Sequence, residues 1–406
     1  MKQVDVICTG FLNSIIGPVQ TIKRIRKNHD YFAESGYDVT IFTSDNISMP
    51  AITKIKNSHS EFVKTMKKVS HWLMNHSWIY SVYRVYHLFR SSHPLLKYYS
   101  SLKRKPDILV FHSLMDYYIY LKCYKLEGIK TACFTHSDGL LFKMLLLGLP
   151  KLQGGIIEKK LMKIADFCMS NVDVKPCIAQ IEERNLLAAY PQLKGKTCLV
   201  VNAIDDLTDD EKSYAKKQRT AHSEFKYRMV SLGSVQRRKG QYTIVTAMNE
   251  LNDEQLSNMH LTILGQGADC FVIQEYMERN PRLKKHIELA GAINNTDVYK
   301  KLASANIMIL MSENEGLPIA LIEGLRSSLA LISTRVSGIP ELINEGANGV
   351  LLNPDKGELL ELFNHFEKYD WDKMGEASRK LFEDYYTFER MRSDYLRMLN
   401  KVFGSN

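Results

Sequence analysis

The 406-residue chain lacks long apolar runs and closely paired cysteines. No run of about 18 apolar residues is present, so the sequence predicts no membrane-spanning helix. The N-terminal run resembles a signal peptide, but Asp5, Asn13 and Gly17 interrupt it, and we interpret it as a strand and a loop. None of the seven cysteines forms a Cys-x-x-Cys pair. Neither disulfides nor a zinc site are therefore expected, and the sequence favours a reducing, cytoplasmic compartment.

The chain is longer than one hydrophobic core usually supports, which predicts two domains. Short β-branched runs alternate with amphipathic segments, a pattern typical of parallel sheets covered by helices. We predict an α/β fold with two Rossmann-like, doubly wound domains that face each other across a cleft. The expected strands are Val4–Thr9, Asp38–Thr43, Asp107–His112, Thr131–Thr135, Asp166–Ser170, Thr197–Val201, Tyr227–Gly233, His260–Leu264, Ile287–Ala290, Ile307–Met311, Ala330–Thr334 and Gly349–Leu352.

The expected domains cover residues 1–203 and 204–385. The polar segment Asp205–Ser223 has little apolar periodicity, as expected of a linker. Residues 386–406 are predicted to close the fold with a helix that packs back toward the N-terminal domain, because Phe388–Phe403 carries apolar residues at helical spacing.

A turn and a helix start follow the predicted strand Ile307–Met311. Gly316 permits a tight turn, and Pro318 suits a first helical turn, where its missing N–H group is not needed. The backbone N–H groups around Leu317 would then point beyond the strand together with the positive end of the helix dipole. The segment is therefore a candidate binding site for a diphosphate.

Two acids accompany this turn. Glu315 lies in the loop, and Glu323 lies about one and a half turns into the helix. One carboxylate could contact a sugar while the other accepts hydrogen bonds from ribose hydroxyls. The alternative is that both acids simply stabilise a helix N-terminus.

A basic loop, Arg237-Arg238-Lys239, follows the strand Tyr227–Gly233 and precedes Gly240. Cations in this position can stabilise the charge that develops on a leaving diphosphate. The alternative is a solvated surface turn. His136 follows the strand Thr131–Thr135, where a side chain can face a ligand or merely end the strand; His112 is placed similarly after its own strand.

The segment after residue 311 resembles the retaining glycosyltransferases of family four, which have the GT-B fold and a Glu-x7-Glu motif. Ser312, Glu315, Gly316, Pro318 and Glu323 match the family's phrase in register. Downstream, Gly338-Ile339-Pro340-Glu341 and Asn348-Gly349 are similar to two further family motifs.

This resemblance implies roles for the candidate residues. Glu315 would contact the donor sugar and Glu323 the nucleotide ribose, while the backbone of Gly316 and Leu317 would meet the sugar and phosphates. His136 resembles the family's active-site histidine.

The resemblance is less complete in two basic or glycine-containing loops. Lys239 matches the family's diphosphate-binding lysine, but Ser234 stands where the family has an arginine, so Arg238 is the expected substitute. Gly17 stands where the family has a glycine-rich loop that approaches the donor or acceptor.

The resemblance implies a retaining, front-face transfer of a hexose or N-acetylhexosamine from a nucleotide sugar, with UDP favoured over GDP. The acceptor would be a glycan or a lipid-linked molecule in cell-surface polysaccharide synthesis. The resemblance also implies metal independence, so neither a metal ion nor another cofactor is expected. A nucleotide-sugar epimerase or a phosphorylase on the same fold is the alternative. No nucleic-acid-binding module is visible, so a nucleic acid is not an expected partner.

The net charge of +9 is concentrated between Ala51 and Lys105, where eleven Lys or Arg residues accompany a single acid, Glu61. Aromatic residues, among them Trp72, Trp78, Tyr83, Tyr86 and Tyr99, are interleaved with these cations. Such a stretch suits docking to an anionic membrane surface on the cytoplasmic side. The alternative is that the aromatic side chains belong to the core and the cations are solvated.

Overall fold

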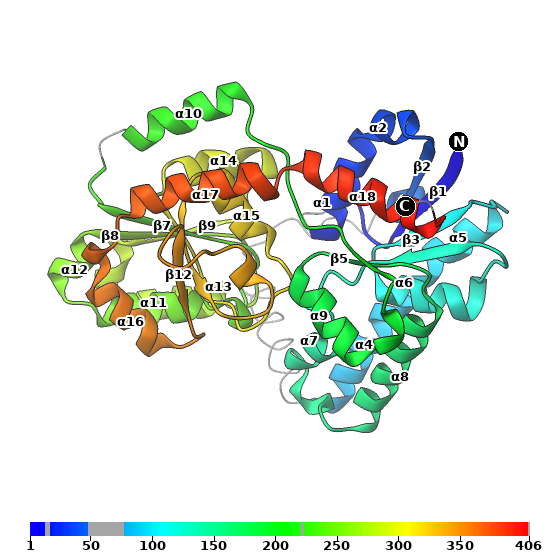
Figure 1. Cartoon of the computed structure of the whole chain (residues 1–406). Coiled ribbons are helices and arrows are strands. Elements are labelled where there is room, and N and C mark those ends of the chain that lie inside the picture. The colour runs from blue at the N-terminus through cyan, green and yellow to red at the C-terminus, as the bar shows by residue number, and fades with distance from the viewer. Residues whose placement is uncertain (13–16, 48–76, 221–222, 405–406) are drawn as a thin grey trace. The chain divides into compact units, whose positions relative to one another are not determined.

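The computed structural model describes residues 1–12, 17–47, 77–220 and 223–404. The chain forms two compact units, which we call the N-terminal unit (Met1–Asn202 with Glu389–Asn406) and the C-terminal unit (Ala203–Phe388). Both are α/β units with parallel sheets, as the sequence predicts (Figure 1). No helix among the described residues is long and apolar enough to cross a bilayer.

The N-terminal unit contains a four-stranded parallel sheet in the order β2-β1-β3-β4 and a parallel pair, β5-β6. A bridge between Ala132 and Val174 links the segments that contain β4 and β5. The strands are β1 (Lys2–Cys8), β2 (Tyr37–Thr43), β3 (Ile108–Phe111), β4 (Lys130–Cys133), β5 (Lys175–Cys177) and β6 (Thr197–Leu199).

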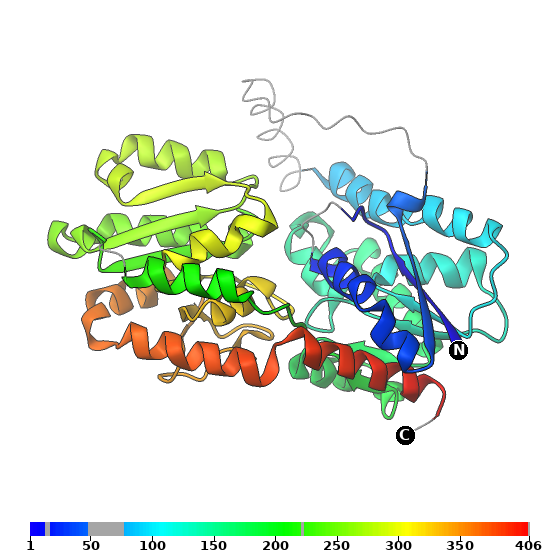
Figure 2. The same cartoon turned by 90° about the horizontal axis from the view of Figure 1, so that it is seen from above.

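The N-terminal unit's described helices include one from the end of the chain. α18 (Phe388–Val402) packs against α2 through the rings of Tyr395 and Phe32, which lie 5.7 Å apart. Figure 2 shows this helix in red beside the blue helices from the start of the chain. The others are α1 (Gly17–Lys27), α2 (His29–Glu34), α4 (Trp78–Arg90), α5 (His93–Ser101), α6 (Leu114–Ile119), α7 (Leu141–Leu147), α8 (Ile156–Asn171) and α9 (Gln180–Ala189), with short helical turns η1 (Ser44–Asn46), η2 (Tyr120–Tyr124), η3 (Pro150–Leu152) and η4 (Pro191–Leu193).

Asp5, which interrupts the first apolar run, is fully buried in the middle of β1. Its carboxylate accepts two hydrogen bonds of 2.8 Å from the Arg104 guanidinium and one of 2.6 Å from the Tyr99 hydroxyl. A buried charge is tolerated when it is paired in this way. Arg104 and Tyr99, both from the basic stretch, therefore stabilise the interior of the fold.

The C-terminal unit contains a six-stranded parallel sheet in the order β12-β11-β10-β7-β8-β9. Numbered from the first strand of the unit, this is the doubly wound order 3-2-1-4-5-6, read from the opposite edge. All six strands predicted for this half of the chain are present. They are β7 (Tyr227–Leu232), β8 (Met259–Leu264), β9 (Ile287–Gly291), β10 (Ile307–Leu310), β11 (Ala330–Thr334) and β12 (Gly349–Leu352).

Helices cover both faces of this sheet (Figure 1). Alternate residues of the strands, such as Met229, Leu261 and Ile309, belong to one buried core with α11 and α16, as the period of two in a strand requires. The helices are α10 (Asp209–Thr220), α11 (Gln241–Glu250), α12 (Asp253–Ser257), α13 (Cys270–Arg279), α14 (Asn295–Ala303), α15 (Ile319–Arg326), α16 (Lys356–Asn364) and α17 (Trp371–Tyr385), with η5 (Arg237–Lys239), η6 (Pro281–Lys285), η7 (Ile339–Glu341) and η8 (Phe366–Lys368).

The sequence prediction is wrong for two whole segments of the fold. Asp166–Ser170 is the last part of α8 and not a strand, because Ala165, Cys168 and Met169 lie on the buried face of that helix. The expected linker Asp205–Ser223 contains α10, whose Tyr214 ring contacts the Tyr299 ring of α14 at 5.8 Å. The polar composition of α10 reflects a helix that buries only a narrow side.

Candidate functional site

The sheet of the C-terminal unit changes its winding direction between β7 and β10. Strands β8 and β9 lie on one side of this point and β11 and β12 on the other. In open α/β sheets, ligands bind beyond the carboxyl ends of the strands at such a point, because the connections there diverge and leave a crevice. The loops that follow β7 and β10 carry the predicted basic and acidic residues.

The loop after β7 lies directly against the loop after β10. Gly240, which ends η5, has φ +73°, and a Cβ atom there would lie 2.1 Å from the Met311 carbonyl oxygen. Only glycine allows this approach. The Glu313 N–H group donates a 2.8 Å hydrogen bond to the Arg238 carbonyl oxygen, which ties the two loops together.

Lys239 and Glu315, 76 residues apart in the sequence, form an ion pair in this place. Their side chains are 12% and 9% exposed, so solvent screens the pair less than a surface pair. The same Glu315 oxygen accepts a 2.7 Å hydrogen bond from the Ser312 hydroxyl. Ser312 is held in turn by Thr334, whose hydroxyl donates a 2.6 Å hydrogen bond to the Ser312 carbonyl oxygen.

The start of α15 completes the loop after β10. Pro318 is its N-cap, with φ −72° and ψ 116°, and therefore lies one residue before the helix and not in the first turn. Gly316 is fixed by the Gly338 N–H group, which donates a 3.0 Å hydrogen bond to its carbonyl oxygen. Glu323 is half-buried on α15, four residues after Ile319.

Arg238, the expected substitute for the family's arginine, donates a 3.1 Å hydrogen bond from Nη1 to the Asn314 carbonyl oxygen. The guanidinium is half-buried and lies against the loop after β10, whereas Arg237 is exposed. The structure thus brings Arg238, Lys239, Glu315, Gly316 and Pro318 together at the predicted end of the sheet.

The second group of candidate residues belongs to the N-terminal unit. β4 ends at Cys133, so His136 lies in the loop that follows it, with the left-handed φ of +50°. Such a backbone conformation is uncommon for a residue with a side chain and persists where the surroundings fix it. Burial, followed by the nearby charge of Lys175, lowers the pKa of His136 to about 3.

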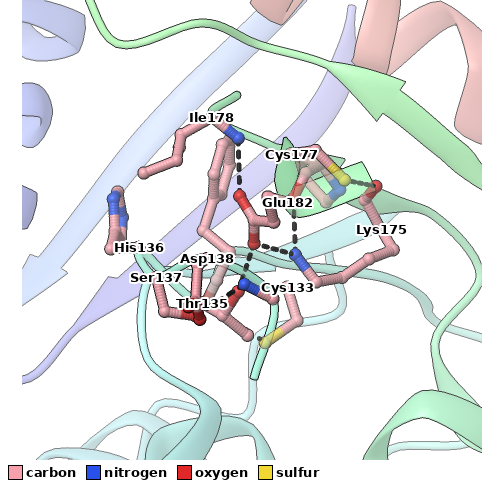
Figure 3. A network of polar contacts seen from close by, with 12 residues as sticks. Cys133, Thr135, His136, Ser137, Asp138, Lys175, Cys177, Ile178 and Glu182 are labelled. Carbon is pink, nitrogen blue, oxygen red and sulfur yellow. Dashed lines mark hydrogen bonds and ion pairs between the residues drawn. The ribbon is translucent and has the colours of Figure 1, made fainter. Parts of the chain in front are cut away.

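A buried polar network fixes the loop that carries His136 (Figure 3). Glu182, at the start of α9, accepts hydrogen bonds from the Thr135 hydroxyl and, at 2.7 Å, from the Ile178 N–H group. Lys175 of β5 lies 3.0 Å from the same carboxylate, and both charged side chains are fully buried. A single carboxylate thereby holds the loop after β4, strand β5 and the segment between β5 and α9.

Gly17, the remaining candidate, is the first residue of α1 and does not lie in the loop where the sequence predicted it. Of the basic aromatic stretch, the residues numbered 51–76, including Trp72, lie outside the described residues. In the described part, Tyr99 is buried, whereas Trp78, Tyr83 and Tyr86 of α4 are each more than half exposed. Tyr99 thus belongs to the core, as the alternative interpretation expects, whereas these three residues of α4 do not.

Sequence reasoning did not identify two residues that fix the His136 loop, Lys175 and Glu182. It also did not identify the 3.0 Å hydrogen bond between His112 Nδ1 and His136 Nε2. Lys175 and Glu182 have opposite charges seven residues apart, at the end of one predicted element and the start of another. That spacing carries no clear signal, because surface charges are as often arranged in the same way. His112 was noted only for its place after a strand.

Residues 212–393 match the model of the family "Glycosyl transferases group 1", which covers nearly all of the C-terminal unit. The chain is similar to the N-acetyl-alpha-D-glucosaminyl L-malate synthase of Bacillus anthracis, with 25% identity over 46% of this chain and 50% of the relative. It spans about half the length of the curated relatives it matches.

Solved structures show the same fold. Sucrose-phosphate synthase from Thermosynechococcus elongatus superposes with a TM-score of 0.74 at 15% identity, over all of both chains. HepE of Anabaena, in complex with UDP, superposes with a TM-score of 0.64 at 12% identity, over 98% of this chain and all of the other. The fold is GT-B, and the match to the group 1 glycosyl transferase model lies almost entirely in the C-terminal unit.

Proposed function

We propose that the protein is a retaining glycosyltransferase that takes a hexose or an N-acetylhexosamine from a nucleotide sugar. The observation that carries this proposal is the ion pair between Lys239 and Glu315 at the winding change between β7 and β10. A cation, a carboxylate and a helix start meet there, inside the segment that matches a glycosyl transferase family. The cation and the helix start suit a diphosphate, and the carboxylate suits the hydroxyl groups of a sugar.

In this proposal the diphosphate competes with Glu315 for the Lys239 ammonium group. A carboxylate relieved of that ion pair can accept hydrogen bonds from sugar hydroxyls, while Ser312 continues to hold it in place. Lys239, Arg238 and the start of α15, with the backbone of Gly316 and Leu317, would stabilise the charge on the leaving diphosphate. Glu323 is proposed to bind the ribose, and Gly17 and His136 are the proposed contributions of the N-terminal unit.

No group is proposed as a covalent nucleophile. The acceptor hydroxyl would attack from the face that the diphosphate leaves and pass its proton to a diphosphate oxygen. The sugar then keeps its anomeric configuration. Because Lys239 and the start of α15 already offer positive charge to a diphosphate, we propose that no metal ion takes part, so activity should persist in excess EDTA.

A panel of nucleotide sugars tests the donor. The donor that binds raises the melting temperature in proportion to the logarithm of its concentration above Kd. We expect a UDP-sugar to bind more tightly than a GDP-sugar, a preference supported by the UDP complex of HepE. Product NMR then distinguishes transfer with retention from epimerisation of the sugar nucleotide and from phosphorolysis, the two alternative activities.

The Glu315→Gln variant tests the site itself. We expect its turnover to fall by about 100-fold or more, the magnitude typical of a lost transition-state contact, while the shift caused by UDP alone remains. Glu313→Gln is the matched control, since Glu313 lies two residues away and is exposed. Equal activity of the Glu315 and Glu313 variants would refute the assignment.

We further propose that the acceptor is a glycan or a lipid-linked molecule and that the N-terminal unit docks on an anionic membrane at its cytoplasmic face. Ile79, Tyr83 and Tyr86 are more than half exposed and recur at the spacing of one helix face on α4. α4 packs against η3, and the neighbouring residues Leu147 and Ile156 are also more than half exposed. Exposed aromatic and aliphatic side chains beside cations suit the interface of an anionic bilayer.

Vesicle flotation tests this docking. We expect the wild-type chain to float with phosphatidylglycerol vesicles and the triple variant Ile79→Ser, Tyr83→Ser, Tyr86→Ser to lose most of this binding. The matched control replaces three exposed tyrosines of the C-terminal unit, Tyr214, Tyr242 and Tyr385, with serine. The membrane would be rejected as the partner if the α4 triple variant floated as the wild-type chain does. It would also be rejected if that variant lost self-association while its flotation stayed unchanged.

A further inference from the structure

His112 occupies the winding change of the N-terminal unit, where β1 and β3 are neighbours. It follows β3 directly, and the residue is only 3% exposed. Its Nδ1 atom lies 3.0 Å from the Nε2 atom of His136. The residue proposed to contact the donor is thus hydrogen-bonded to a second, more deeply buried histidine.

The imidazole of His112 lies within a stack of aromatic rings. Its plane is 17° from that of Phe134 at a centroid distance of 4.4 Å, and 12° from that of Tyr395 of α18 at 6.4 Å. The His136 ring is nearly parallel as well, at 26° and 5.2 Å. Close packing on these rings fixes the plane in which His112 can offer a hydrogen bond.

Only one proton can occupy the line between the two histidines. Burial and then the proximity of His136 lower the pKa of His112, and burial and then Lys175 lower that of His136. Both rings are therefore neutral near pH 7, and each carries one N–H group. Either His112 donates from Nδ1, or His136 donates from Nε2.

The surroundings of His112 distinguish these two arrangements. Its Nε2 atom is buried and has no hydrogen-bond partner among the described residues. If His136 were the donor, the proton of His112 would have to sit on this Nε2 atom, as a buried N–H group without an acceptor. Buried donors without a partner are rarer than buried acceptors with an unused lone pair. The arrangement with His112 as donor is the favoured one.

We propose that His112 is a positioning residue that donates its Nδ1–H group to His136 and thereby holds His136 in the Nδ1–H tautomer. His136 Nε2 is then occupied as an acceptor. Its Nδ1–H group makes no hydrogen bond with a described residue and is available to an oxygen of the donor sugar. His136 therefore acts as a hydrogen-bond donor to the substrate and not as a base, an inference that rests on the proposed function.

Three variants of His112 separate a hydrogen-bonding role from a packing role. The amide nitrogen of His112→Asn is bonded to Cγ, as Nδ1 is, whereas that of His112→Gln lies one bond further, as Nε2 does. His112→Phe keeps an aromatic ring in the stack and removes both nitrogens. We expect kcat to fall by about 10- to 100-fold in the Phe and Gln variants, as for other partners that orient a functional histidine, with KM for the donor within about twofold. The Asn variant should retain most of kcat.

Nitrogen-15 NMR of the histidine rings tests the tautomer without any substrate. We expect His136 to show a protonated Nδ1 and an unprotonated Nε2 in the wild-type chain, and a mixture of both tautomers in His112→Phe. His286→Phe is the matched control, because His286 also uses Nδ1 for a 3.0 Å contact, to the Met259 carbonyl oxygen, and lies in the C-terminal unit.

A protonated Nε2 on wild-type His136 would overturn the proposal, as would equal loss of kcat in the Asn and Phe variants at unchanged melting temperature. If the wild-type chain transfers no sugar, the proposed function fails, but the ring spectra still decide the role of His112. The two failures are thus distinguishable. Should His112→Phe not fold, the Asn and Gln variants alone provide the comparison.

Discussion

At the scale of single residues, the protein keeps several charges and polar groups in its interior by pairing each one. Asp5, Glu182 and Lys175 are fully buried and hydrogen-bonded, and Glu315 is nearly so. Removing one partner of such a group leaves the other without compensation, which costs more than the pair itself contributes. These residues therefore affect stability and function together, and variants must separate the two effects.

The pair of Lys175 and Glu182 allows such a separation. Glu182→Gln leaves a buried ammonium group without its counter-charge, and we expect the free energy of unfolding to fall by about 3–5 kcal/mol. The double variant Lys175→Met, Glu182→Gln removes both charges and should lose less than the sum of the two single variants. Urea denaturation of the four proteins measures this coupling. Strict additivity of the two losses would contradict the buried ion pair.

The two neutral histidines predict a pH dependence of stability. The folded-state pKa of His136 is about 3, below the unfolded value of 6.5, so the unfolded chain binds more protons between these values. Stability is therefore complete above pH 6.5 and is lost as pH falls toward 3. We expect the melting temperature to fall between pH 7.5 and pH 5.

The variant His112→Phe removes one of these two groups and should show a shallower fall over the same range. A variant of the exposed His87 is the control and should follow the wild-type curve. A fall of equal steepness in all three proteins would show that carboxylates elsewhere, and not these histidines, set the acid stability.

At the scale of elements, the loops after β7 and β10 meet because small residues allow two backbones to touch. Gly240→Ala would introduce a Cβ atom 2.1 Å from the Met311 carbonyl oxygen, at φ +73°. We expect a loss of about 2–4 kcal/mol, the sum of a left-handed alanine and an overpacked contact, together with a loss of nucleotide binding.

Gly346→Ala is the matched control for the element prediction. Gly346 has φ +78°, but nothing lies within 4 Å of its added Cβ atom, so only the backbone cost should remain. Thermal denaturation and the shift produced by UDP measure both effects. If the two variants were equally stable and bound the nucleotide equally well, the close approach of the loops would have no functional importance.

The elements also show what the sequence could predict. The six strands of the C-terminal unit consist mostly of apolar residues, and the sequence identifies all of them. β5 (Lys175–Cys177) was missed, because it has three residues, begins with a lysine and contains a proline, all unfavourable to a central strand. Its lysine is buried only because Glu182 neutralises it, and that contact is set by tertiary structure.

In the candidate site, too, the sequence identifies local features but not the contacts that tertiary structure sets. The spacing around Glu315 and the place of Lys239 after a strand are local, and the sequence identified both. Their contact across 76 residues depends on the strand order, which a single sequence does not specify. His112 could be placed after a strand, but neither its hydrogen bond to His136 nor its stacking on Tyr395 is encoded in local spacing.

At the scale of the whole molecule, the chain passes from the N-terminal unit to the C-terminal unit, and its last segment, Glu389–Asn406, again belongs to the N-terminal unit. The Phe388 N–H group donates a 3.0 Å hydrogen bond to the Ile204 carbonyl oxygen, and Thr387 forms a β-bridge with Ile204. The beginning and the end of the C-terminal unit are therefore hydrogen-bonded to each other. α18 then contributes Met391, Tyr395, Met398, Leu399 and Val402 to the interior of the N-terminal unit. The stability of that unit thus depends on the last residues of the chain.

A chain that ends at Phe388 should therefore lose the N-terminal unit and keep the C-terminal one. Burying a large apolar side chain contributes about 1.5–3 kcal/mol. Losing five such side chains therefore removes an energy comparable to the whole net stability of an ordinary domain, about 5–15 kcal/mol. We expect hydrogen exchange to lose protection across β1 and β3 but not across β7 and β10. A chain that ends at Val402 keeps α18 and serves as the control. If the shorter chain protected β1 as well as the control does, the N-terminal unit would fold without α18, and the closing helix would be an accessory to the fold.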